Sequence, residues 1–557
     1  MPRLPPELSA QFDREEENAL AHIAQFKNIA EIDSIGCVEW TVIYEYDKNY
    51  KADKFFYSAI LNKNQTEAAL SRKTWDLSVG QGTPSFTQRH DMRGDITTYD
   101  RFGMDNVEPL VYFRNFHGIK PDQFDLSEEF RLFHNLYFDK NSNNFIYIDG
   151  RGNEVIVAEI GDKKVRVLTS FLKKYLAARQ MNLAVFFDHR ANSDLSLLEV
   201  NNLAEPVEFS SKDRCYSLGF GDGIFSGKTF SRLLGKKIIY APPIEACGVW
   251  PYEDAEKKEY KEFIVGIDAE GSLIKNTCDP DCLANYFGSN EESSHYLTPV
   301  WFSRDVLEKY YNNPGKYSVE DGYVRCGSLW GIQIDNNIPD HVMVYLGDLG
   351  RDLSSEEQGH WVNYNLTPSD RTPSKVNFER SFNAKFSIPS EPDLLFKYLY
   401  QKLNEKWMEK NGWHLFREIH SGDEHIIKQV RLLFSNNLGE FDHQILFLVK
   451  LLIDYLNESQ LVSACGGALP DEKGIGKLDR YLTKYNYPHR VRDIKLLRLL
   501  QNLRSSGAAH AKGGRFDRVH KDIGLDKKSA PEVFREIMEK INKMLNDIHD
   551  FFFNEDD

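Results

Sequence analysis

The chain has 557 residues, of which 41% are hydrophobic and 27% are charged. This composition excludes a disordered or fibrous protein, and the length predicts two or three domains, since a domain usually holds about 100 to 200 residues. No window approaches the roughly 20 apolar residues of a membrane span, and the first residues lack the apolar core of a secretory signal. We therefore expect a cytoplasmic protein without a membrane partner. Its seven scattered cysteines indicate reduced thiols rather than a disulfide scaffold.

The formal net charge of −15 is distributed unevenly along the chain. Between Asp471 and Ala530 there are 15 Lys or Arg and 7 Asp or Glu residues, a local charge of +8 that leaves −23 for the remainder. A phosphate backbone as partner would explain such a basic segment in an acidic protein. A solvated helical face docked on the acidic remainder would explain it as well.

Residues 1–235 are predicted to form an α+β domain. Helices are expected at 14–25 and 171–180. Strands are expected where β-branched and aromatic residues cluster or alternate with polar ones, namely at 37–46, 145–149, 154–160, 164–168 and 183–187. Residues 236–389 predict mostly β structure, with strands at 237–241, 263–268, 330–335 and 342–346. The sequence leaves open whether this second stretch is a separate domain or continues the first.

Residues 390–557 predict an all-helical bundle. The run 441–457 is apolar on nearly every side, as expected of a central helix, and 490–506 carries a broad apolar stripe with basic residues between. Residues 529–532 signal a last helix, in which Ser caps, Pro takes the first turn and Glu closes a capping box. The predicted fold class is a multidomain α+β chain, with a mixed α/β and mostly-β N-terminal portion followed by an all-α bundle.

The end of the helix at 490–506 carries Arg504 and, six residues later, His510. On an unbroken α-helix the two side chains would lie about 240° apart around the axis, which is about 120° in the other sense, and could not share one phosphate. Gly507 allows the helix to end and the chain to turn, which would bring His510 back beside Arg504. Histidine titrates near neutral pH and can transfer a proton, while the planar guanidinium of arginine can hold phosphate oxygens as negative charge develops.

This arrangement resembles the Arg-x4-6-His signature of the HEPN superfamily, small helical bundles that commonly cleave RNA without a metal. The resemblance covers roughly residues 395 to 557 and rests on helix order, motif position and the two residues. It implies an endoribonuclease without metal or cofactor, in which Arg504 clamps the phosphate and His510 is the general acid or base. The 2′-hydroxyl of RNA would be the nucleophile. A homodimer through the bundle is implied as well, because family members usually pair two such domains around one groove.

Residues near the motif are expected to line that groove and bind the RNA backbone: Arg492, Arg498, Asn502, Lys512, Arg515 and His520. Chains that resemble HEPN toxins with an appended sensor are often bacterial antiphage defence proteins or toxins that cut tRNA or mRNA. We therefore interpret the N-terminal portion as a sensor of an unknown trigger. Its negative charge could mask the basic segment until that trigger arrives, a hypothesis that deletion of residues 1–389 would address.

Two alternatives stay open at the level of the sequence. In the first, the bundle is a non-catalytic HEPN-like module that dimerises or binds RNA and regulates an activity in the N-terminal portion. In the second, an enzyme site lies within residues 1–389 and the bundle is a dimerisation scaffold. Substitution of Arg504 and His510 separates the second alternative from the ribonuclease, since activity would survive both changes.

Two further motifs are interpreted as structural. The glycines in 219–229 have the wrong spacing for a phosphate-binding loop, which needs four residues between them, so we expect a turn-rich loop there. Cys278 and Cys282 form one close pair, and Cys326 and His295 do not supply the second close pair that is typical of a zinc site. No metal site is predicted.

Two segments with histidines are interpreted in the same way. His134 lies in a predicted helix beside aromatic residues and is expected to be a core histidine with a satisfied ring. Residues 188–190, an Asp-His-Arg sequence after a predicted strand, are expected to form a polar turn rather than a catalytic site.

Overall fold

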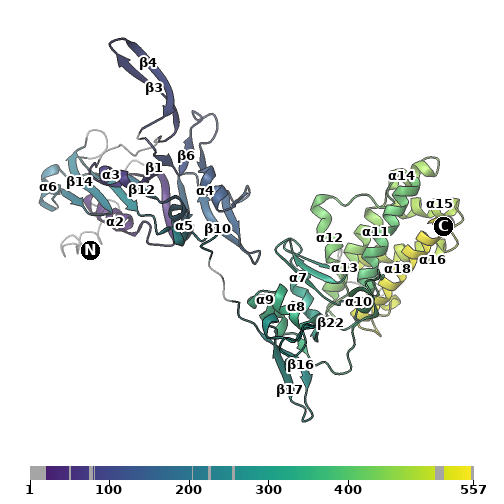
Figure 1. Ribbon diagram of the computed structural model, residues 1–557. Helices are drawn as coiled ribbons and strands as arrows, with labels where there is room; N and C mark the ends of the chain where they lie inside the picture. The colour runs from purple at the N-terminus through teal and green to yellow at the C-terminus, as the bar shows by residue number, and fades with distance from the viewer. Residues whose placement is uncertain are drawn as a thin grey trace. The chain divides into compact units, whose positions relative to one another are not determined.

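The computed structural model describes residues 21–48, 52–73, 80, 82–103, 105–203, 205–223, 228–253, 258–507 and 520–553. The chain divides into two compact units, Met1–Glu256 and Lys257–Asp557. The first unit is mainly antiparallel sheet, whereas the second combines small sheets with a helical C-terminal part, so the chain is a multidomain α+β protein (Figure 1). Among the described helices, none combines the length and the apolar character needed to cross a membrane.

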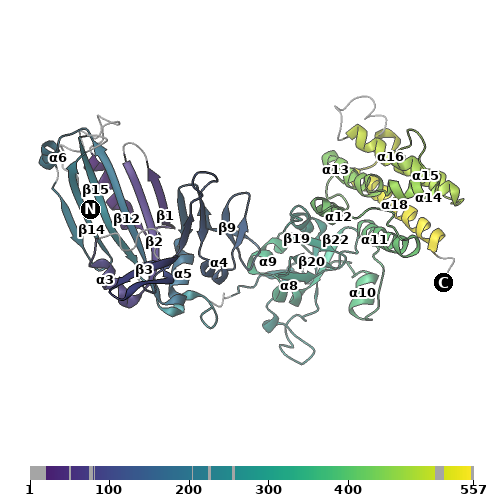
Figure 2. The same ribbon diagram turned by 90° about the horizontal axis from the view of Figure 1, so that it is seen from above.

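One antiparallel sheet organises the first unit, and Figure 2 shows its central strands side by side. Its order is β13 (Val207–Ser210), β14 (Arg214–Asp222), β15 (Thr229–Ile239), β12 (Met181–Ser193), β2 (Ala52–Asn62), β1 (Trp40–Lys48), β11 (Lys164–Leu168), β10 (Glu154–Ile160), β9 (Asn144–Ile148) and β8 (Tyr137–Asp139), with β5 (Glu108–Pro109) paired to β2. The central strand β12 is buried along almost its whole length, so both of its faces are covered. The boundary expected at residue 235 falls inside β15, which pairs with β12, and the first unit continues beyond it.

Helices and hairpins complete the first unit. α2 (Ala21–Ser34) overlaps the helix expected at 14–25 only over residues 21–25 and continues to Ser34, whereas residues 14–20 lie outside the described residues; it packs against β12 and β15. α5 (Thr169–Arg179) leads from β11 into β12 and ends at Gln180, which has a left-handed φ of 51°. The remaining elements are α3 (Thr66–Leu70), α4 (Glu128–Phe133), α6 (Leu197–Leu203), the hairpin β3 (Pro84–Asp91)–β4 (Gly94–Arg101) and the hairpin β6 (Val111–Arg114)–β7 (Gln123–Leu126). The exposed β3–β4 hairpin extends away from the sheet (Figure 1).

Residues 258–389, here called the β-rich part, mix small sheets with short helices. The strands form the pair β16 (Glu262–Ile267)–β17 (Leu273–Thr277), the sheet β22 (His341–Tyr345)–β18 (Pro299–Ser303)–β23 (Asn365–Leu366) and the sheet β19 (Tyr317–Glu320)–β20 (Tyr323–Cys326)–β21 (Trp330–Gln333). The helices are α7 (Glu308–Tyr311), α8 (Leu346–Asp352), α9 (Ser355–Val362) and α10 (Lys375–Ser381). These helices depart from the mostly-β expectation, because none is longer than 8 residues and helical periodicity does not stand out over so short a run.

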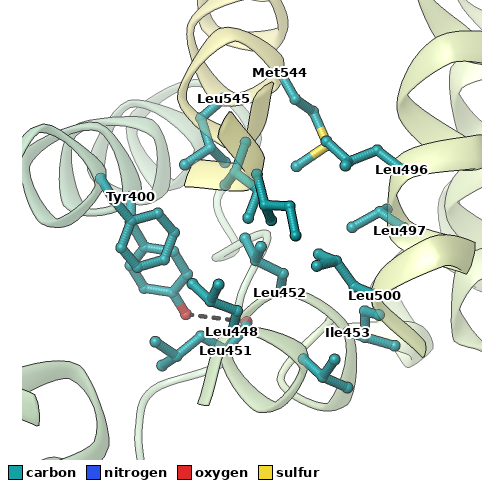
Figure 3. Packing of buried hydrophobic residues seen from close by; sticks show 14 of the residues in the cluster. Tyr400, Leu448, Leu451, Leu452, Ile453, Leu496, Leu497, Leu500, Met544 and Leu545 are labelled. Carbon is teal, nitrogen blue, oxygen red and sulfur yellow. Dashed lines mark hydrogen bonds between the residues drawn. The ribbon is translucent and has the colours of Figure 1, made fainter. Parts of the chain in front are cut away.

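Residues 390–553 form the helical bundle. Its elements are α11 (Pro392–Asn411), α12 (Glu424–Gln429), α13 (Leu438–Val449), the π-helical turn η7 (Lys450–Asp454), α14 (Glu458–Ala464), α15 (Gly474–Lys484), α16 (Arg490–Gly507) and α18 (Ala530–Phe553). The core gathers apolar side chains from α11, α13, η7, α16 and α18, and the Tyr400 hydroxyl donates to the Leu451 carbonyl at 3.4 Å (Figure 3). The capping box expected before α18 is confirmed. The Ser529 backbone N–H and hydroxyl both donate to the Glu532 carboxylate at 2.8 Å, and the Glu532 N–H donates back at 3.4 Å.

A buried ion network joins the β-rich part to the bundle. Arg304, which follows β18, donates to Glu391 at 3.1 Å and to both oxygens of Asp393 at 3.2 and 3.3 Å, where α11 begins. Arg535 of α18 donates to the same Glu391 oxygen at 2.9 Å. The side chains of Arg304, Glu391 and Asp393 are only 11%, 5% and 1% exposed. The network therefore ties three segments that are far apart in the sequence into one body.

Replacing Arg304 by Met should destabilise the second unit by about 3–5 kcal/mol, because Asp393 would keep a buried charge without its cation. Urea unfolding followed by tryptophan fluorescence measures this, since most tryptophans lie in the second unit, at 301, 330, 361, 407 and 413. Lys375→Met is the control. Lys375 is 87% exposed and lies 3.7 Å from Glu379, so its loss should change the unfolding free energy by less than about 0.5 kcal/mol. Equal effects of the two substitutions would contradict the role of the network.

Candidate nucleic-acid interface

The outer face of α16 carries positive charge close to the predicted motif. Val491, Lys495, Arg498 and Asn502 recur every three or four residues, so they share one face of the helix. The opposite side is apolar and packs into the bundle core. Together with Asp479 and Arg490, the outer face lines a pocket of about 440 Å³, here called the α16 pocket. Helix α15, which carries Asp479, lies beside α16 (Figure 2).

The α16 pocket holds three cations and one carboxylate. Asp479 pairs with Arg490 at 2.6 Å and lies 3.9 Å from Arg498. Within the described residues Lys495 makes no ion pair, and the side chain of Arg498 is 62% exposed. A net positive pocket with extended side chains and an amide can bind a phosphate backbone. Arg490 and Lys495 also line this pocket but were not among the residues predicted from the sequence. Helical periodicity could have identified them, because they lie on the same face of α16 as Arg498.

The predicted arginines of α16 point in three directions. Arg492, Arg498 and Arg504 are six residues apart, which rotates each by about 120° from the next on an α-helix. Arg492 pairs with Asp493 and with Asp547 of α18, both at 2.7 Å or less, away from the α16 pocket. The structure therefore brings Arg498 and Asn502 together but places Arg492 and Arg504 on other faces.

Arg504 is held by Asp454, the last residue of the π-helical turn η7. The Arg504 guanidinium donates to the Asp454 carboxylate at 2.7 Å, and the two side chains are 32% and 45% exposed. Arg417 contacts the same residue and donates to the Asp454 backbone carbonyl at 2.7 Å. Two guanidinium groups thus meet at Asp454, from residues 87 positions apart in the chain.

The neighbouring side chains form a second polar set. Lys450 and the Tyr455 hydroxyl donate to Asp423 at 2.7 and 2.8 Å. These hydrogen bonds lower the pKa of the Asp423 carboxyl, which keeps it charged near neutral pH. The Arg417 guanidinium lies 5.8 Å from the centre of the Tyr455 ring. Sequence patterns did not reveal this set, because its members come from separate segments with no shared periodicity.

Three of the predicted site residues lie outside the described residues, namely His510, Lys512 and Arg515. The described part of α16 runs to Gly507, so the turn expected at this glycine stays a prediction. His520 is described and is buried, 8% exposed, with its ring 6.4 Å from that of Phe441. This position places it in the bundle interior rather than in the α16 pocket.

The motifs interpreted as structural are accounted for by local packing. The His134 ring lies among Phe130, Phe133 and Phe171, and its Nε2 is 3.0 Å from the Phe171 carbonyl, as expected of a satisfied core histidine. The turn expected at 188–190 is wrong. These residues lie within β12, where Asp188 accepts two hydrogen bonds from Arg232 at 2.8 and 3.0 Å.

The other two motifs are the glycine-rich segment and the cysteine pair. The loop expected at 219–229 is wrong for residues 219–222, which belong to β14 and pair with β15; residues 224–227 lie outside the described residues, and β15 begins at 229. Buried Cys278 lies 3.3 Å from the Gln358 side-chain oxygen. No group of three or more His, Cys, Asp or Glu side chains that could hold a metal ion occurs among the described residues.

The β-rich part contains a second pocket, of about 560 Å³. It is lined by Tyr296, Asp335, Asp348 and Arg351, among others. Burial raises the pKa of both Asp335 and Asp348. Asp335 accepts from the Ser374 hydroxyl at 2.8 Å, and Asp348 accepts from the Tyr296 hydroxyl at 3.1 Å. If residues 1–389 hold an enzyme site, this pocket offers the perturbed carboxylates that acid–base catalysis uses.

Comparison of the chain with protein-family models, with curated proteins and with solved structures finds no match. The interpretation of the site therefore depends on its geometry and on the sequence motif.

Two buried histidines should make the first unit sensitive to acid. Burial lowers the pKa of His134 to about 4 and that of His189 to about 3, well below the ordinary value of 6.5. Between pH 6.5 and 4 the unfolded chain binds protons at these rings and the folded chain does not, so the unfolding free energy falls as pH falls, by about 1.4 kcal/mol per pH unit for each ring.

Urea unfolding followed by far-ultraviolet circular dichroism between pH 7.5 and 4.5 measures this dependence. His134→Gln should make this dependence shallower by the contribution of one ring, about 1.4 kcal/mol per pH unit. A wild-type slope that survives His134→Gln unchanged would show that the ring is protonated in the folded unit.

Proposed function

We propose that the helical bundle is a metal-independent endoribonuclease that holds an RNA backbone along α16 and cleaves it at Arg504 and His510. The observation that carries the proposal is the α16 pocket, whose cationic face ends at Asn502, two residues before Arg504. The resemblance to the HEPN superfamily supplies the reaction type. Under this proposal the protein is an effector of a bacterial antiphage defence or toxin system, with tRNA or mRNA as substrate and no cofactor.

The reaction needs proton transfer and charge stabilisation. The 2′-oxygen attacks phosphorus while its proton passes to a histidine, and the bond from phosphorus to the 5′-oxygen breaks as that oxygen takes a proton. The products are a 2′,3′-cyclic phosphate and a 5′-hydroxyl. Arg504 would hold the non-bridging oxygens as charge develops on them. Because one histidine does not serve easily as acid and base together, we propose a homodimer in which each bundle supplies His510.

A phosphate can take the place of Asp454 on Arg504. Both side chains of the pair are partly exposed, and exposed ion pairs contribute only about 0–1 kcal/mol. A phosphate offers the planar guanidinium two oxygens in the same way as the carboxylate does. Arg417, which donates to the Asp454 backbone rather than to its side chain, stays in place during this exchange.

Incubation of the full-length protein with total RNA in EDTA tests the activity. We expect cleavage products with cyclic phosphate ends, lost in Arg504→Ala and in His510→Ala, because each removes one half of the chemistry. Intact RNA that nevertheless shows a stable gel shift would support the non-catalytic module instead. Cleavage that survives both substitutions would place the site elsewhere, within residues 1–389.

The α16 pocket makes a separate prediction about RNA affinity. In a His510→Ala background, Lys495→Ala combined with Arg498→Ala should reduce the slope of log affinity against log salt by about 1.4, since about 0.7 ions are released per phosphate contact with a single strand. Fluorescence anisotropy with a labelled single-stranded RNA measures the slope. Lys540→Ala, an exposed lysine of α18 outside the pocket, is the control and should leave it unchanged. An unchanged slope in the double variant would exclude the pocket as the RNA path.

Asp454→Asn tests the exchange at Arg504. Removing the carboxylate charge frees the guanidinium, so RNA affinity in the His510→Ala background should rise about two- to five-fold, the equivalent of roughly 0.5–1 kcal/mol. The gain should disappear when Arg504→Ala is added. A fall in affinity on Asp454→Asn would mean that the pair positions Arg504 for RNA instead of competing with it.

A further inference from the structure

A pocket between α11 and α18 lies away from the α16 pocket and from Arg504. It has a volume of about 380 Å³, within the range of sites for small organic ligands, roughly 300 to 1,000 Å³. Its walls are one face of α11, one face of α18 and the segment 388–392 that leads from the β-rich part into the bundle. The lining residues that determine its chemistry are Leu395, Tyr398, Lys402, Arg535, Asn542 and Lys543.

The two helical faces differ in chemistry. The α11 face is apolar and aromatic, with Leu395, Tyr398 and Leu399 at adjacent helical positions. The rim is cationic. Because Arg535 already pairs with Glu391, the other charged side chains that line the pocket are the two cations Lys402 and Lys543 and the one carboxylate Glu539. One positive charge is left without a counterpart among the residues that line the pocket.

Asn542 adds an unsatisfied acceptor to this wall. It is 5% exposed, and its Nδ2 donates to the Pro392 carbonyl at 2.8 Å. Within the described residues its Oδ1 has no hydrogen-bond partner. A buried acceptor without a partner costs about 1–3 kcal/mol, a cost that a donor on a bound molecule would remove.

We propose that the pocket between α11 and α18 binds an organic anion with an aromatic ring and an N–H or O–H donor, about the size of a nucleoside monophosphate. The ring would lie on Leu395 and Tyr398, the anionic group would meet Lys402 and Lys543, and the donor would reach Asn542. Since Arg535 and the segment 388–392 belong both to this pocket and to the junction with the β-rich part, the site suits a regulatory ligand. The inference does not depend on the ribonuclease activity.

The fluorescent anion 8-anilinonaphthalene-1-sulfonate has all three features, because it carries a naphthalene ring, an anilino N–H and a sulfonate. Titration of the folded full-length protein should show one saturable site, weakened at least ten-fold by Lys543→Glu. The uncharged analogue N-phenyl-1-naphthylamine lacks the sulfonate, so the same substitution should change its affinity less than two-fold. Lys540→Glu, which makes the same charge change on the same helix outside the pocket, is the matched control and should leave both probes unaffected.

Three outcomes would overturn the proposal: sulfonate binding that survives Lys543→Glu, an equal loss in Lys540→Glu, or an equal loss for the uncharged probe. Because Lys543 is exposed, the substitution should leave the fold intact, and an unchanged thermal unfolding midpoint checks this. A second variant, Asn542→Leu, removes the acceptor. It should weaken the sulfonate probe. Because the substitution also removes the hydrogen bond to the Pro392 carbonyl, the midpoint should fall as well, and a lower midpoint without weaker sulfonate binding would contradict the contact between Asn542 and the donor.

Discussion

The ion network of Arg304, Glu391, Asp393 and Arg535 constrains the second unit more than any surface contact. Charges that are almost fully removed from water are tolerated only while each keeps its partner, so the β-rich part, α11 and α18 hold one another in a single arrangement. A cut at residue 389 would remove Arg304 and leave Asp393 charged inside the bundle. Masking by the acidic N-terminal portion is therefore better tested by a truncation between 256 and 257, where the two compact units divide.

Within that body, the apolar stripe of α16 decides where its charges lie. Leu497, Leu500 and Leu503 are each at most 2% exposed, and burying a leucine side chain is worth about 1.5–3 kcal/mol. The exposed ion pairs of Arg498 and Arg504 contribute about 0–1 kcal/mol each. The core contacts thus fix the rotation of the helix, and the cations occupy whatever faces remain. The cationic face therefore follows from helical periodicity, because Lys495 and Arg498 fall on the outer side of the helix while the leucines fall on the inner side.

The sequence predicted features that depend on neighbours in the chain. The strands at 154–160 and 164–168, the helix at 490–506 and the cap at Ser529 all follow from local alternation, periodicity or spacing. It did not predict the second half of β12, because Asp188 looks like a turn residue unless Arg232, 44 positions away, is known to pair with it. The contact between Arg504 and Asp454 was missed for the same reason, since it joins residues 50 positions apart.

The separation of cations on α16 bears on the proposed dimer. Arg498 and Arg504 are about 120° apart around the helix, so one bundle does not present both to a straight run of phosphates. In the proposed dimer, a twofold axis running between the two faces would change this geometry, because the Arg498 face of each copy would then lie opposite the Arg504 face of the other. A groove shared by two bundles could combine the α16 pocket of one copy with Arg504 of the other, which neither copy offers alone. The arrangement of charges on this one helix therefore favours the same assembly that two-histidine proton transfer requires.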